Sequence, residues 1–134
     1  MAKETGLGMT LSVDDSGGSL RDLSNDITNV SFDTPRGSFD VTGLDKSGIE
    51  RLQGLADGEV TINGVFNDAA NKSHAVFKDV SSTSVTRTVT IAISGQTLSM
   101  EMVLDNYALT RAADGSFTYS VTARLQSGAV PTWA

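Results

Sequence analysis

The chain has 134 residues, with sixteen acidic against ten basic side chains and a net charge of −6. Its length is typical of a single domain, residues 1–134, with a core of its own. The absence of cysteine excludes disulfides and thiolate chemistry, and the acidic balance argues against tight binding to the phosphates of nucleic acids.

The first half of the chain predicts short strands separated by turns. No signal-peptide pattern opens the sequence and no apolar run is long enough to span a bilayer, so we expect a soluble chain without membrane insertion. Residues 1–8, which include Gly6-Leu7-Gly8, are expected to form a flexible arm. Strands are predicted at Met9–Val13, Leu20–Asp33, Ser38–Thr42 and Glu59–Phe66, with a turn at Asp14–Gly18 and a bulge at Asn63-Gly64.

Two short helices are predicted between these strands. Ser47 and Glu50 have the spacing of a capping box and Gly54 supplies a stop, which predicts a helix of about two turns. Residues Asp68–Asp79 predict a second helix, with Asn67 or Asp68 as its cap. Its apolar residues would face the core: Ala69, Val76, Phe77 and Val80.

The last third of the chain alternates between apolar and polar residues over three long stretches. This period of two predicts strands at Val85–Ile93, Thr97–Asp105 and Ser116–Gln126, joined by glycine-containing turns at Ser94–Gln96 and Ala113–Gly115. The fold class expected from the whole pattern is all-β with one or two short helices, arranged as an antiparallel β-sandwich or partial barrel.

Few residues point to chemistry. The single histidine, His74, has no G-x-S-x-G serine nearby and too few companions for zinc. Asp14-Asp15-Ser16-Gly17 lacks the spacing of a calcium loop and fits a turn better. A pair of glycosidase carboxylates remains formally possible, although the only tryptophan, Trp133, leaves little for sugar stacking. We therefore expect no enzyme activity, no cofactor and no metal.

The segment Val30–Leu55 holds an exposed polar loop between two phenylalanines, which either close the core or anchor a neighbouring subunit. The order of short motifs from about Leu11 to Trp133 resembles the tail tube (major tail) proteins of long-tailed bacteriophages. Gly43-Leu44-Asp45 departs from the Thr-Phe-Gly frequent in that family. The motifs are Asp22-Leu23-Ser24, Val30-Ser31-Phe32-Asp33, Asp40-Val41-Thr42, Gly54-Leu55-Ala56-Asp57-Gly58, Gly64-Val65-Phe66, Arg87-Thr88-Val89-Thr90, Tyr107, Asp114-Gly115, Phe117 and Trp133.

The resemblance implies a structural virion protein that assembles in the host cytoplasm. Copies would form hexameric rings that stack into a hollow tail tube, in which one sheet of each subunit joins a continuous barrel around the lumen. DNA would pass through this lumen during ejection without specific binding. A tape measure protein and a tail terminator are implied as further partners of the self-assembled tube.

Two sets of residues would serve this assembly. A protruding loop at residues 31–45 would reach the adjacent ring through Phe32, Asp33, Thr34, Pro35, Arg36, Gly37 and Phe39. The acidic residues Glu59, Glu101 and Asp105 lie on polar strand faces and are the residues expected to line the lumen and repel DNA.

Alternatives remain open at this point. Within a virion, the chain would instead be a tail terminator or joining protein, or the tube subunit of an injection machine. Outside that class, it would be a monomeric β-sandwich that binds ligands or mediates adhesion, or a carboxylate-dependent hydrolase.

Overall fold

The computed structural model describes residue 3 and residues 5–134, and nearly all of its regular structure is antiparallel sheet. The arm expected over residues 1–8 therefore lies partly outside the described residues. In chain order, the elements are β1 (Thr10–Asp14), β2 (Leu20–Asp22), β3 (Ile27–Asp33), β4 (Arg36–Asp40), β5 (Arg51–Ala56), β6 (Glu59–Val65), α1 (Ser73–Phe77), β7 (Arg87–Ile93), β8 (Gln96–Arg111) and β9 (Phe117–Leu125).

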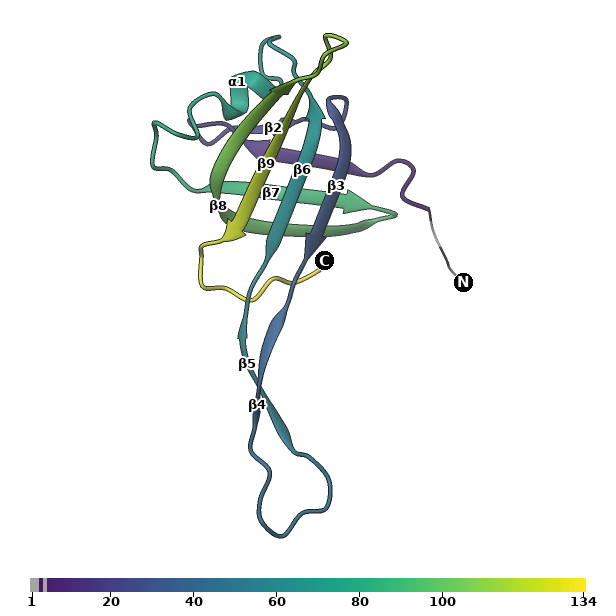
Figure 1. The fold of residues 1–134 in the computed structure, drawn as a ribbon, viewed down its shortest axis with the longest axis vertical. Helices are drawn as coiled ribbons and strands as arrows, with labels where there is room; N and C mark the ends of the chain where they lie inside the picture. The colour runs from purple at the N-terminus through teal and green to yellow at the C-terminus, as the bar shows by residue number, and fades with distance from the viewer. Residues whose placement is uncertain (1–2, 4) are drawn as a thin grey trace.

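Seven strands form one sheet in the order β2-β1-β7-β8-β9-β6-β3, and the sheet does not close into a barrel. It folds over into two layers: β1 and β7 run across the molecule in Figure 1, whereas β9, β6 and β3 run steeply. The 16-residue β8 belongs to both, because it pairs with β7 over Gln96–Met102 and with β9 over Met102–Arg111. A register shift between Leu104 and Asn106 marks a bulge, a feature that bends a strand. The expected all-β antiparallel sandwich is confirmed.

The core lies between the two layers and includes most of the apolar residues predicted from the alternation, together with Leu23 and, from α1, Val76 and Phe77. In β8, the four side chains Leu98, Met100, Met102 and Leu104 are all buried. The strand then continues to Arg111, well past the predicted end at Asp105. The prediction stopped too early because the bulge shifts the alternation by one residue, so the second half of β8 does not continue the period of two. The turn between β7 and β8 has two residues with positive φ, Ser94 at 52° and Gly95 at 80°, as a tight antiparallel hairpin requires.

Several predicted strands differ from the observed ones in their limits. Leu20–Asp33 is two strands, because Leu23 enters the core and a turn, closed by Asp26 N–H to the Leu23 carbonyl, separates β2 from β3. Asn63-Gly64 lies within the continuous β6, as expected, but the extra residue of the bulge is on the partner strand β3, between Ile27 and Asn29.

The second predicted helix is present but shorter than expected. It spans Ser73–Phe77, with Val76 and Phe77 buried, whereas Ala69 is exposed in the preceding turn. The buried Asp26 carboxylate explains where the helix begins, because it accepts hydrogen bonds from the Ser73 N–H at 3.1 Å and the Asn67 side chain at 2.8 Å. Of the described residues, none belongs to a helix long and apolar enough to cross a bilayer.

The helix predicted from Ser47 to Gly54 is wrong. Its second half is strand β5, which pairs with β4. Glu50 does not complete a capping box, because its backbone N–H donates to the Thr42 hydroxyl across the hairpin at 2.9 Å. A helix of about two turns has no stability of its own without a core to pack against, and this segment projects away from the core.

Arg87 is a buried cation that the sequence pattern did not reveal. It occupies an inward position of β7, only 1% exposed, where its guanidinium donates to the carbonyls of Val76 and Asp14 and to the Asp79 carboxylate at 2.9 Å. Burial alone would raise the pKa of Asp79, but hydrogen bonds from Ser16 and Arg87 and the charge of Arg87 outweigh it and hold the pKa below 3.8. Arg87 thus ties the loop after α1 to β1 and β7 of the sheet.

Replacing Asp79 with Asn is expected to lower the free energy of unfolding at neutral pH by roughly 2 kcal/mol, since it leaves the buried guanidinium less compensated. The loss should shrink as the pH falls through the depressed pKa of Asp79, because the protonated acid resembles the amide. Urea unfolding at several pH values measures both effects. The exposed Asp45–Lys46 pair provides the control: Asp45→Asn should change stability by less than about 0.5 kcal/mol.

Candidate assembly surfaces

The most prominent surface feature is the hairpin of β4 and β5, which projects from the body beyond β3 and β6 (Figure 1). Contacts within the hairpin hold its shape. The Phe39 ring lies over Gly54, where an added Cβ would come within 2.7 Å of it, and the Arg36 guanidinium donates to the Gly54 carbonyl at 2.9 Å. At the start of the connecting loop, Thr42 donates to the Asp40 carboxylate at 2.6 Å. The projection is therefore a built strand pair rather than an irregular loop.

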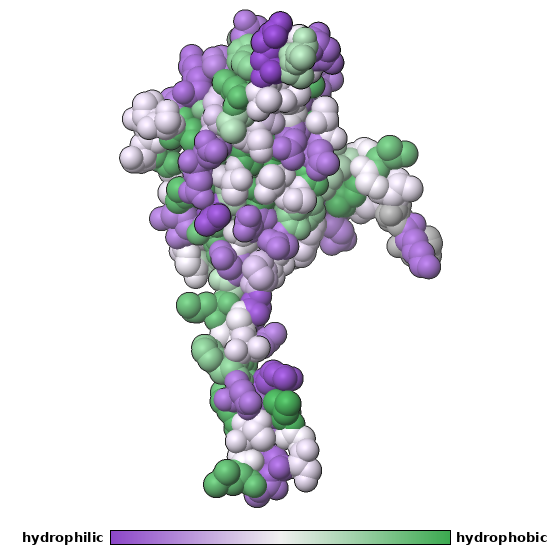
Figure 2. All heavy atoms as spheres, viewed as in Figure 1, coloured by the Kyte–Doolittle hydropathy of each residue, from purple (hydrophilic) through white to green (hydrophobic). Residues whose placement is uncertain are grey.

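The hairpin exposes an unusual number of large apolar side chains. Leu44 at its tip is fully exposed and Leu55 is 90% exposed, and four others are exposed as well: Phe39, Val41, Ile49 and Leu52. Apolar residues recur along the projection in Figure 2. A two-stranded hairpin is at best marginally stable in water, and exposed apolar surface of this extent marks an interaction site. The hairpin is suited to be covered by another molecule.

The structure separates the residues expected in the protruding loop. Ser31, Phe32 and Asp33 belong to β3 in the body, where the half-buried Phe32 ring packs against Trp133 with centroids 6.0 Å apart. The link to the hairpin contains Thr34 and Pro35, and the Pro35 carbonyl accepts a hydrogen bond from the Asp57 N–H. Arg36, Gly37 and Phe39 are in β4. The return strand β5 was not predicted from the sequence. Its exposed Leu52 and Leu55 do not have the spacing of residues that pack into a core, and this spacing was the available signal for a projecting segment.

A second surface is the outward face of the layer made by β3, β6, β9 and the second half of β8. The strand register aligns its residues in rows across the layer, and two of these rows contain only small or polar uncharged side chains. They are Ser31–Thr61–Thr122–Asn106 and Asn29–Asn63–Ser120–Ala108.

Charged residues lie at the end of this face nearest the hairpin. Asp33 and Glu59 are directly opposite each other, and Glu59 is in turn opposite Arg124. Arg124 pairs with Asp105 at 3.3 Å. Of the three predicted acidic residues, Glu59 and Asp105 thus share this face. Glu101 lies where β8 pairs with β7, and its carboxylate accepts a hydrogen bond from the Thr88 hydroxyl at 2.8 Å.

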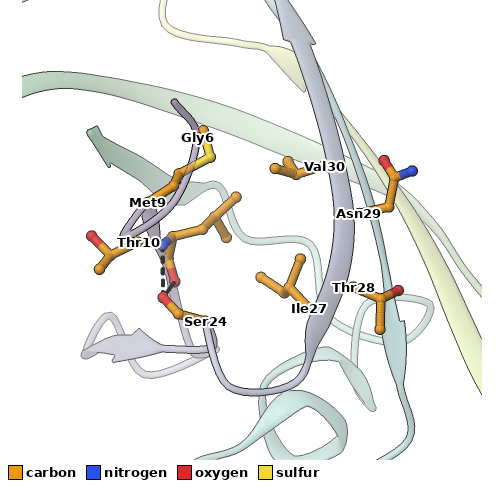
Figure 3. Close-up of a pocket in the computed structure, with 9 residues that line it drawn as sticks. Gly6, Met9, Thr10, Ser24, Ile27, Thr28, Asn29 and Val30 are labelled. Carbon is orange, nitrogen blue, oxygen red and sulfur yellow. Dashed lines mark hydrogen bonds between the residues drawn. The ribbon is translucent and has the colours of Figure 1, made fainter. Parts of the chain in front are cut away.

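Two free edges flank this polar layer, one at β3 and one at the second half of β8. Within the described part of the chain, no strand pairs with β3 on the side away from β6, nor with residues 103–111 of β8 on the side away from β9. Figure 3 shows the open side next to β3, where Ile27 and Val30 turn towards Met9 across a pocket of about 210 Å³ and Thr28 and Asn29 turn away from it. Unpaired edges of this length invite pairing with another chain.

In the described part of the chain, the two candidates for chemistry, His74 and the Asp14–Gly17 turn, make structural contacts. The His74 ring packs on Phe66 with centroids 4.7 Å apart, and its Nδ1 is 3.2 Å from the Tyr107 hydroxyl, inside an aromatic cluster. Asp15 closes a turn: hydrogen bonds from the backbone N–H of Ser19, then from Arg21 and Gly17, hold its pKa below the usual value. No three potential metal ligands come together in residue 3 and residues 5–134.

Replacing Asp33 with Asn should raise the free energy of unfolding by up to about 0.5 kcal/mol, because like charges directly opposite each other in a sheet repel. The gain should be largest at low ionic strength and should disappear in a Glu59→Gln background. Denaturant titrations of the two single variants and the double variant measure the coupling. A gain that persists without the Glu59 charge would show that the two carboxylates do not interact.

Comparisons with known proteins give a fold but no sequence family. No family model matches the chain, and no curated protein matches it in sequence. Its structure is similar to a chain described as "Virion of native gene transfer agent (GTA) particle", with a TM-score of 0.80, 13% identity, and coverage of 97% of this chain and 99% of that one. It is also similar to a chain described as "Tail of empty GTA particle computed with helical refinement, C6 symmetry", with a TM-score of 0.76, 16% identity, and coverage of 98% and 99%. Over nearly its whole length, this chain has the fold of those particle proteins.

Proposed function

We propose that this chain is a structural, non-enzymatic tail protein of a phage-like particle, which polymerises as stacked hexameric rings into the tail tube. The observation that carries the proposal is the pair of free sheet edges on either side of one polar layer, next to an apolar hairpin. The shared fold with a chain from a tail of C6 symmetry supports both the tail role and the sixfold ring. The virion tail is then its location, after assembly in the host cytoplasm.

Ring closure follows from strand direction. The strands β3, β6, β9 and β8 are antiparallel in succession, so β3 of the next copy fits against residues 103–111 of β8 without breaking the alternation. Repeating this contact around an axis joins the four-stranded layers into a closed barrel, and closure pairs both free edges of this layer. The contact uses two different surfaces of each copy, which is the kind of interface that produces rings.

Stacking of the rings is assigned to the hairpin. It extends beyond the end of the sandwich and carries the largest group of exposed apolar side chains in the molecule, among them Leu44, Ile49 and Leu55. A contact with the adjacent ring would bury these side chains, at about 25 cal/mol per Å² of apolar surface removed from water.

The polar layer is assigned to the lumen. Its rows of Ser, Thr and Asn offer DNA no cation to hold a phosphate, and the charges at its end are mostly acidic: Asp33, Glu59 and Asp105 against Arg124. Such a wall lets DNA pass without binding it, since phosphate contacts with Lys and Arg dominate affinity for DNA. A tape measure protein inside the tube and a terminator at its end are the further partners of this proposal.

Concentrated purified protein should form rings or tubes of uniform diameter in negative-stain electron microscopy. A tail terminator would stop at a single ring and never elongate. A monomeric ligand-binding or adhesion module would sediment as a monomer at every concentration, and that result would overturn the proposal.

Replacing Leu44 with Asp should abolish stacking and leave rings and the folded monomer intact, because the side chain contacts nothing within its own copy. The conservative variant Leu44→Met should still form tubes. Microscopy reports the assembly state and urea unfolding reports the fold. Normal tubes from Leu44→Asp would remove the hairpin tip from the ring interface.

Replacing Glu59 with Lys should permit tubes but reduce DNA delivery by particles at least several-fold, because the added cations would retain phosphates as they pass. Glu101→Lys is the matched control, since Glu101 lies on the part of β8 that pairs with β7, and it should leave delivery unchanged. Equal effects of the two substitutions would show that the polar layer does not line the channel.

A further inference from the structure

A groove of about 370 Å³ lies beside β8, between this strand and the loop that follows α1. Val80, Val85, Val103 and Leu104 give it an apolar part, bordered by polar residues of the loop, and Val85 and Val103 are each 39% exposed. The loop is fixed in place, because the Thr83 N–H donates to the Asp79 carbonyl at 3.0 Å and Arg87 binds the Asp79 carboxylate. The groove is therefore preformed, and it begins where the free edge of β8 begins.

An exposed leucine is found on the opposite side of the molecule. Leu7 is 85% exposed and lies in a turn closed by the Met9 N–H to the Gly6 carbonyl at 3.3 Å. This segment runs past the open side next to β3, where Gly6 and Met9 line the same pocket as Ile27 and Val30 (Figures 1 and 3). Each copy therefore has an apolar side chain beside one free edge and an apolar groove beside the other.

We infer that Leu7 of one copy binds in the Val80–Leu104 groove of the adjacent copy in the same ring. The inference rests on the proposed ring closure, because pairing of β3 with β8 brings both features to the same seam. The interface between neighbouring copies would then combine this side-chain contact with the backbone pairing of β3 and β8. The contact joins unlike surfaces, so each copy gives a leucine to one neighbour and receives one from the other.

Cysteine cross-linking tests the contact in a chain that has no cysteine of its own. Gly6→Cys adds a side chain where a Cβ meets no atom within 4 Å and keeps Leu7 intact, while Ser84→Cys is isosteric on the rim of the groove. Rings assembled from a mixture of the two single variants are treated with a short bis-maleimide and separated by denaturing electrophoresis. We expect cross-linked dimers from the mixture and none from either variant alone, and a ladder of multimers from the double variant.

Gly48→Cys is the matched control, because Gly48 in the hairpin loop is equally open to an added Cβ. Mixed with Ser84→Cys, it should give no cross-link. A cross-link from Gly48 and none from Gly6 would show that the groove receives the hairpin of the next ring, and would overturn the inference. Rings visible by microscopy without any Gly6–Ser84 cross-link would also overturn it and leave the proposed function standing. Absence of rings would overturn the proposed function and this inference with it.

Discussion

In the layer made by β3, β6, β9 and the second half of β8, the inner strands β6 and β9 have a strand partner on both sides, whereas β3 and the second half of β8 have a partner on one side only. Unpaired backbone groups that leave water without a partner cost free energy, so such edges stay solvated or find another strand. In this molecule the two edges have compatible directions and flank the same layer. The same constraint therefore accounts for the open sandwich of the single copy, and it is the basis on which we propose a closed wall for the assembly.

The polar layer has a composition that does not maximise the stability of a single copy. Placing Asp33 directly opposite Glu59 is unfavourable in an isolated sheet, and the nearby Arg124 is already engaged by Asp105. A sequence selected for stability alone would place opposite charges there. Retaining the repulsion is consistent with a surface that must not bind a polyanion, and the free-energy penalty of a few tenths of a kcal/mol is small beside the core.

Alternation along the chain was enough to predict the sandwich, because β7, the first half of β8 and the middle of β9 bury every second residue. It failed where the cause of the structure is not local. Arg87 occupies an apolar position of β7 because carbonyls and a carboxylate distant in sequence surround its guanidinium. The residues from Ser47 to Gly54 have good helix signals, but no core is present to stabilise a helix, and pairing with β4 prevails.

The candidate surfaces were only partly predictable for the same reason. Strand faces follow from sequence, and Glu59, Glu101 and Asp105 all lie on polar faces, but the bend in β8 that separates Glu101 from the other two depends on a bulge. Likewise, Phe32 and Phe39 flank the same short loop in sequence, yet one packs against Trp133 in the body and the other covers Gly54 in the hairpin.

The continuity of β8 has a mechanical consequence. One 16-residue strand runs through both layers, because the first half of β8 pairs with β7 and its second half pairs with β9. The two layers of a copy are therefore linked by covalent backbone as well as by the hydrogen bonds on each half of the strand. This connection couples the orientation of one layer to that of the other. In the proposed tube, curvature would then concentrate in the slender two-stranded hairpins assigned to the contact between rings, so the filament would bend at its joints while its bore kept a constant width.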